Sequence, residues 1–226
     1  MSVSFEGFSQ NTLDFLWNLR FNNEKSWFEA HREEYQAHLL RPIKALEQEV
    51  YDRLDAHFHI ADKGLIHRLS RIHRDARRIR SGGPYRDHLW FGIEPSCAEG
   101  YPGLTFWFTL NPEDWSCGLG QYYTSPAAMK KLRVRIDTDP RAFEALIAPL
   151  EKQGEFVLDG PDYACKKEAP TAKTAPWYNK KSFSLLHSQT NGSELFLPDF
   201  AARLSSGFEF LMPFYEYFIT LDSDPD

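Results

Sequence analysis

The sequence predicts an α+β fold: a single domain over residues 1–226, with a mainly antiparallel, meandering sheet packed by N-terminal, middle and C-terminal helices. Apolar residues recur at helical spacing near both ends of the chain and at alternate positions in its first half, after residue 64. The connections between the alternating segments are too short to hold a crossover helix. Neighbouring strands are therefore expected to run antiparallel around one core.

The first quarter of the chain is predicted to be helical. Ser9 is a candidate cap for a first helix that stops near Asn22. Asn23 is a candidate cap for a second helix, which carries an aromatic stripe. Pro42 suits the first turn of a third helix, where its missing N–H costs no hydrogen bond.

Four strands are expected after Gly64, where the period of apolar residues changes toward two. Leu89, Phe91 and Ile93 show this alternation in one of them. Turn residues such as Asn111 separate the segments. The expected strands cover residues 65–75, 87–94, 103–110 and 116–123.

Two helices are expected in the middle of the chain, because Ser125 and Asp139 are each followed by a proline that suits a first helical turn. The second of these helices should end near Pro149. Residues 154–181 are polar and rich in Pro and Lys, which indicates a long ordered loop, and residues 182–189 are predicted to return as a fifth strand.

Pro198 is expected to open a last helix, and Pro213 to kink it or divide it in two.

The composition indicates a cytoplasmic protein without a membrane span, because the N-terminus lacks the features of a signal peptide and no apolar run approaches about 20 residues. The three cysteines are far apart and form no C-x-x-C spacing, so neither a disulfide framework nor a zinc site is predicted. No metal and no cofactor is expected. The pair His57 and His59 lacks an acidic or thiol partner at a motif spacing.

Positive charge is concentrated in one stretch of an acidic chain. Residues 68–86 hold seven Arg, no Lys and one Asp, a net charge of +6, whereas the whole chain carries −6. Arginine binds carboxylates and phosphates through a rigid planar fork. An anionic or phosphorylated small ligand is therefore the leading prediction, with one set of candidate binding residues: Arg71, Arg74, Arg77, Tyr85 and Arg86. The alternative is that these arginines pair with internal carboxylates or face water.

Three titratable residues beside this stretch are the candidates for acid/base chemistry. His73 or His88 would be the base, and Asp75 would orient it. Asp75 is equally suited to pairing with an arginine. The sequence shows no nucleophile elbow and no dinucleotide fingerprint, so whether the protein is an enzyme stays open.

The order of four motifs resembles the domain-of-unknown-function family 2461. They are NNEKSWF at residues 22–28, RIHRD-x-R at 71–77 with PYR at 84–86, the glycine-rich segment CGLGQYY, and the helix SPAAMKKLRVRI. Where family members carry an aromatic residue and lysines between RD and PY, this chain has Arg78, Arg80 and Gly82. The resemblance implies the fold and a pocket, and it gives no catalytic residues.

Two other classes of function remain alternatives. A nucleic-acid-binding module would use aromatic side chains to stack bases beside the arginines, but the net charge of −6 makes nucleic acid a poor partner. A protein–protein interaction domain would use the arginine strand as a docking edge, with no affinity for small molecules. Oligomeric state cannot be read from the sequence.

Overall fold

The computed structural model describes residues 4–75, 77, 83–96, 103–121 and 124–224. Expectations that concern Arg78, Arg80, Gly82, Cys97 and residues 122–123 lie outside this part of the chain. The α-helices are α1 (Gln10–Phe21), α2 (Lys25–Ala30), α3 (Arg32–Glu34), α4 (Arg41–Phe58), α5 (Pro126–Thr138), α6 (Pro140–Lys152), α7 (Ala175–Tyr178) and α8 (Phe200–Ile219). Shorter turns of other types are the π-helix η1 (Tyr35–Leu40) and the 3₁₀ helices η3 (Ser193–Phe196) and η4 (Leu221–Ser223).

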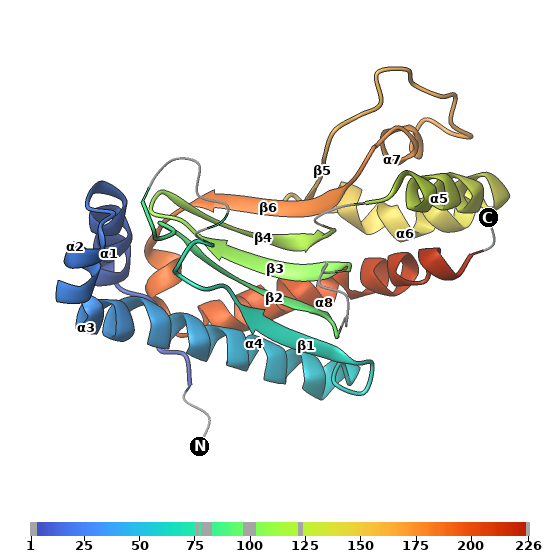
Figure 1. Cartoon of the computed structure of the whole chain (residues 1–226). Coiled ribbons are helices and arrows are strands. Elements are labelled where there is room, and N and C mark those ends of the chain that lie inside the picture. Colours follow the sequence, from blue (N-terminus) through green and yellow to red (C-terminus); the bar gives the residue numbers. More distant parts are fainter. Residues whose placement is uncertain (1–3, 76, 78–82, 97–102, 122–123, 225–226) are drawn as a thin grey trace. The chain divides into compact units, whose positions relative to one another are not determined.

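The strands form a six-stranded sheet in the order β1-β2-β3-β4-β6-β5 (Figure 1). They are β1 (Leu65–Leu69), β2 (Leu89–Pro95), β3 (Thr105–Leu110), β4 (Asp114–Gly120), β5 (Val157–Asp159) and β6 (Ser184–Thr190). The sheet is an antiparallel meander over β1 to β4, as short connections require. The chain returns through α5 and α6, and β5 then pairs antiparallel with β6. The predicted fold class is confirmed.

The chain divides into two compact units. The first comprises Met1–Ile93, Trp107–Cys117 and Ser188–Gly207, and the second comprises Glu94–Phe106, Gly118–His187 and Phe208–Asp226. The boundaries fall inside β2, β3, β4, β6 and α8, so no linker segment separates the units. The expectation of a single domain over residues 1–226 stays a prediction.

Aromatic side chains build the core of each unit. In the first unit, Phe108 of β3 packs against Phe200 of α8, with ring centroids 5.8 Å apart. In the second unit, Phe106 of β3 packs against Phe208 of α8 at 5.4 Å. Neighbouring side chains of β3 and α8 thus meet in both units, and each such pair excludes a large apolar area from water.

Several helix boundaries follow local capping rules. The Ser125 hydroxyl accepts a hydrogen bond from the Ala128 N–H at 3.0 Å, and the Asp139 carboxylate accepts one from the Ala142 N–H at 2.9 Å. Both predicted caps are confirmed. Proline effects are weaker than expected, because α6 continues past Pro149 to Lys152 and α8 continues through Pro213 to Ile219 without dividing.

The expected boundaries near the arginine-rich stretch differ from the observed ones. Strand β1 ends at Leu69 instead of reaching residue 75, and a separate bridge forms further on between His73 and Tyr85. The third predicted helix is α4, which begins at Arg41 with Pro42 in its first turn as expected, although α3, η1 and α4 follow one another without a break. A π-helix carries one extra residue per turn, and such segments are frequent at functional sites.

Candidate functional site

Asn23 holds the segment around Tyr85 in place. The Asn23 Oδ1 accepts a hydrogen bond from the Tyr85 N–H at 2.9 Å, and Asn23 Nδ2 donates one to the Tyr85 carbonyl at 3.0 Å. A Cβ on Gly83 would lie 2.1 Å from the Asn23 backbone oxygen, so this close approach requires glycine. The prediction that Asn23 caps the second helix is wrong, because Glu24 is the N-cap of α2.

The bridge between His73 and Tyr85 decides which way the predicted site residues face. The Arg74 N–H donates to the Pro84 carbonyl at 2.9 Å, and the Arg86 N–H donates to the Ile72 carbonyl at 2.7 Å. Side chains alternate between the two faces of such an extended pair. Alternation therefore places Arg71 with His73 on one face, and Arg74 with Arg86 on the other.

The strand pairing changes register between this bridge and β1. Arg86 pairs with Ile72, whereas the Ser70 N–H already donates to the Trp90 carbonyl at 2.8 Å. Arg71 alone therefore faces the three residues 87–89, which form a bulge. The Trp90 N–H bonds the Ser70 hydroxyl at 2.9 Å instead of a backbone carbonyl. Bulges of this kind re-aim side chains and are common beside functional sites.

A pocket of about 500 Å³ lies in the first unit, between the helical segment α2–α4 and the chain after β1. One wall comes from the helices and η1, and the other from residues 69–73. Its lining residues are Phe28, Arg32, Tyr35, Gln36, Leu40, Lys44, Leu69, Ser70, Arg71, Ile72 and His73. This volume lies within the usual range of small-molecule sites.

Among the described residues, the pocket lining carries three permanent cations and no carboxylate. Arg71 was predicted as a ligand-binding residue, whereas Arg32 and Lys44 were not, because they lie on helices far from it in sequence. Arg32 meets Glu29 only loosely, with 3.9 Å between Nε and Oε2. Burial raises the pKa of Tyr35 to about 12, so this phenol adds no negative charge. The pocket is therefore suited to an anion.

The other candidate residues lie elsewhere. The Tyr85 side chain is only 2% exposed and stacks on Phe28, with ring centroids 4.1 Å apart. Arg77 is highly exposed and pairs with Asp75, with 3.2 Å between Nε and Oδ1. Arg86 is half-buried, and its Nε has no hydrogen-bond partner in the described part of the chain. The structure thus brings Arg71 and His73 together, but Tyr85 serves the core and Arg77 serves a local ion pair.

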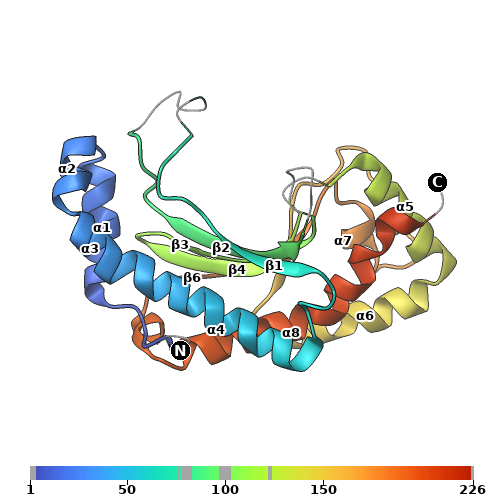
Figure 2. The same ribbon diagram turned by 60° about the horizontal axis from the view of Figure 1, so that its bottom comes forward.

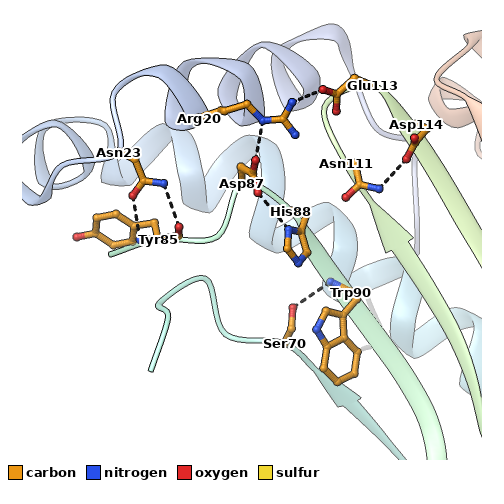
Figure 3. A network of polar contacts seen from close by, with 10 residues as sticks. All are labelled: Arg20, Asn23, Ser70, Tyr85, Asp87, His88, Trp90, Asn111, Glu113 and Asp114. Carbon is orange, nitrogen blue, oxygen red and sulfur yellow. Dashed lines mark hydrogen bonds and ion pairs between the residues drawn. The ribbon is translucent and has the colours of Figure 1, made fainter. Parts of the chain in front are cut away.

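His88 belongs to a polar network beside Arg20 (Figure 3). Asp87 accepts a hydrogen bond from Arg20 Nε at 2.6 Å, and its other oxygen lies 3.1 Å from His88 Nδ1. Arg20 also pairs with Glu113. Partial burial opposes ionisation of Asp87, but the bonds to His88 and Arg20 outweigh it and lower the pKa of this carboxyl. The residue that orients His88 is therefore Asp87, not Asp75.

Among the described residues, no group of three or more His, Cys, Asp or Glu side chains could hold a metal ion. None of the described helices is both long and apolar enough to cross a membrane.

Comparison with known families adds the decisive match. The model of a conserved hypothetical protein family, DUF2461, matches residues 11–217, which is most of the chain. The chain belongs to the DUF2461 family. A search of curated proteins finds no match.

Two of the four motifs that resembled DUF2461 in the sequence meet at this site. The NNEKSWF motif supplies Asn23 and Phe28, RIHRD supplies Arg71 and His73, and PYR supplies Tyr85. Asn23 bonds the backbone of Tyr85, and Phe28 stacks on its ring. Motifs far apart in this DUF2461 chain thus contribute to both walls of the pocket and form the clamp on Tyr85.

Proposed function

We propose that this DUF2461 protein binds an anionic small molecule, with a phosphate group as the favoured anion, in the pocket formed by Arg32, Lys44, Arg71 and His73. The observation that carries the proposal is the charge of the lining. In the part of the chain that the structure describes, three permanent cations and a histidine line one pocket without any acidic side chain, and the whole chain has a net charge of −6. Like charges that gather in one pocket repel one another, and a bound anion offsets this repulsion.

The shape of the pocket supports a small molecule. Cationic groups enter from both walls, since Arg32 and Lys44 come from the helices and Arg71 from the strand side. Guanidinium and ammonium groups that converge from two sides can hold a phosphate through several charge-assisted hydrogen bonds. A long polyanion binds along an extended surface and does not require a pocket of this kind.

The remaining lining residues indicate the chemical character of the rest of the ligand. Phe28, Leu40, Leu69 and Ile72 are apolar, and Gln36 and Ser70 offer neutral hydrogen-bonding groups. Ligand sites commonly combine apolar walls with a few polar groups that fix orientation. We therefore expect a ligand with an anionic end and a partly apolar body.

His73 is the candidate for acid/base chemistry inside the pocket, because it lines the hollow on the same strand face as Arg71. His88 is the second candidate, held by Asp87. Only binding is proposed for this pocket. Catalytic turnover is to be measured for each ligand that binds.

The test is a thermal-shift screen of the wild type and the Arg71→Ala variant. The probes are inorganic phosphate, pyrophosphate, citrate and a single-stranded oligonucleotide, each at low and moderate salt. We expect phosphate or pyrophosphate to raise the wild-type melting temperature by mass action, and to act much less on Arg71→Ala.

Other outcomes of the screen would contradict the proposal. Stabilisation by the oligonucleotide alone, with a steep salt dependence, would favour a nucleic-acid module. If no probe acts on the wild type, small-anion binding is wrong, and a protein partner becomes the better explanation.

A further inference from the structure

A buried carboxylate lies next to a histidine outside the residues discussed so far. Glu47 of α4 is only 6% exposed, and its Oε1 lies 3.3 Å from Nδ1 of His67 on β1. Tyr51, one turn further along α4, covers the imidazole with ring centroids 4.6 Å apart. A buried carboxylate without a partner would be costly, so the contact with His67 explains why Glu47 can be tolerated.

This pair lies where the helix and the strand begin to separate. Helix α4 runs alongside β1 in the opposite direction (Figure 2), and their contacts follow in order. The Tyr51 hydroxyl donates to the Leu65 carbonyl at 2.8 Å, and Glu47 meets His67 next. The residues that follow on each side, Lys44 and Leu69, already line the pocket.

Glu47 and His67 therefore lie next to the lining residues Lys44 and Leu69, just outside the lining itself. One helical turn separates Glu47 from Lys44, a rise of about 4.5 Å. Two strand residues separate His67 from Leu69, about 6.6 Å, and they share a strand face. An anion held by Lys44 and Arg71 would lie within about 10 Å of the imidazole by these spacings.

The imidazole of His67 can form further hydrogen bonds. Its buried Nδ1 lies near Glu47 but makes no well-directed hydrogen bond in the described part of the chain. Buried polar atoms without a directed partner are rare in native proteins and are often explained by function. In the protonated imidazole both ring nitrogens carry a proton, so Nδ1 can donate to the Glu47 carboxylate.

We infer that His67, positioned by Glu47 beside the cationic pocket, responds to the charge of a bound anion, and that an anionic ligand is bound together with a proton on this imidazole. The inference rests on the proposed function, since it needs an anion in the pocket. It adds a coupling between ligand binding and pH that the permanent cations cannot provide, because Arg and Lys keep their charge at neutral pH.

The charges around His67 set the direction of this coupling. On α4, the Glu47 carboxylate raises the pKa of His67, with partial burial opposing it and Asp52 adding a weaker effect in the same direction. On β1, the neighbouring Arg68 belongs to the opposite strand face. The register of Ser70 with Trp90 places the apolar Ile93 of β2 opposite His67. A bound anion would therefore raise the pKa further, and affinity should increase as the pH falls.

The experiment is an NMR titration of the imidazole resonances between about pH 5 and pH 9, with and without saturating pyrophosphate. We expect pyrophosphate to raise the pKa of His67 by about half a unit or more, as expected for a polyanion at this distance in a partly solvated site. His187, which lies in the second unit and bonds the Glu155 carbonyl, should not respond.

Two variants separate His67 from His73, which lines the pocket. His67→Gln should keep pyrophosphate binding but lose most of the increase in affinity toward low pH, whereas His73→Gln should retain the part due to His67. If pyrophosphate binds and Arg71→Ala abolishes binding, but the pKa of His67 does not move, this inference is overturned and the proposed function stands. If pyrophosphate does not bind the wild type at all, the proposed function fails, and the inference with it.

Discussion

Arg20 and Arg71 lie in the same compact unit, yet the charges of the side chains around them differ in sign. Arg20 is held between the carboxylates of Asp87 and Glu113 (Figure 3). Arg71 lines a pocket with Lys44, and none of the described lining residues carries a carboxylate. A cation whose charge is matched by internal carboxylates stabilises the fold and has little capacity left for a ligand. A cation without such a match contributes little to stability and is better explained by binding.

The same division into matched and unmatched cations separates arginines within the basic stretch, residues 68–86. The predicted set of Arg71, Arg74, Arg77 and Arg86 treats them alike. The structure separates them by strand face and by partner, since Arg77 pairs with Asp75 and Arg71 faces the pocket. Substitution of a matched residue should therefore lower stability and leave anion binding largely intact. Substitution of an unmatched cation should weaken binding and leave stability largely intact.

The largest effect is expected for Gly83→Ala, which disturbs both regions at once. The new Cβ would meet the Asn23 backbone oxygen at 2.1 Å and Oδ1 at 2.2 Å, which breaks the clamp on Tyr85. We expect a loss of about 3 kcal/mol, the upper end of typical overpacking costs, measured by urea unfolding. Gly154→Ala is the matched control, because nothing lies within 4 Å of its Cβ position. Equal stability of the two variants would show that the clamp is unimportant.

Asp87→Ala tests the matched region alone. The substitution removes the carboxylate that holds Arg20 and His88, and it leaves a partly buried guanidinium with Glu113 as its remaining carboxylate. We expect about 2 kcal/mol of destabilisation, typical of a lost hydrogen bond to a charged group. The measurement is chemical unfolding, and pyrophosphate binding should persist in the folded variant. A stable Asp87→Ala protein that no longer binds the anion would reverse the comparison.

The pH dependence of stability sharpens the same comparison. Because the pKa of Asp87 is lowered in the folded state, its contribution is complete above the ordinary carboxyl value of 3.8 and is lost as the pH falls through the folded value. The wild type should therefore lose more stability than Asp87→Asn between about pH 5 and pH 3. Unfolding curves over this range check the sign, and parallel losses in the two proteins would refute it.

The smallest effect on stability is expected for Lys44→Ala in the unmatched region. Lys44 is exposed and forms no ion pair in the described part of the chain, so the free energy of unfolding should change by less than about 0.5 kcal/mol. Removal of one of three neighbouring cations can slightly increase the free energy of unfolding. A loss comparable to that of Asp87→Ala, measured under the same conditions, would mean that Lys44 is structural.

Local rules explain which parts of the fold could be predicted from the sequence. The caps at Ser125 and Asp139 act within three residues of themselves, and the short connections fix the antiparallel order of β1 to β4. The role of Asn23 could not be predicted in this way, because its partner Tyr85 lies 62 residues further along the chain. An asparagine before a helix is usually read as a cap.

The candidate site was predicted in part, and the limits have physical causes. Charge concentration pointed to Arg71, but Arg32 and Lys44 join it only because α4 folds back along β1. The division between Arg71 and Arg74 could have been foreseen, since an odd spacing on an extended strand puts side chains on opposite faces. The π-helix that supplies Tyr35 and Gln36 has no comparable signal in the sequence.

The central claim is that the unmatched cations, and not the basic stretch as a whole, bind an anion. Its most direct test is a calorimetric titration of pyrophosphate into the wild type, Arg71→Ala and the matched control Arg77→Ala. We expect Arg71→Ala to bind about tenfold more weakly or worse, as the loss of a charge-assisted hydrogen bond implies, and Arg77→Ala to bind like the wild type. Equal weakening by both substitutions, or no binding to the wild type, would contradict the claim.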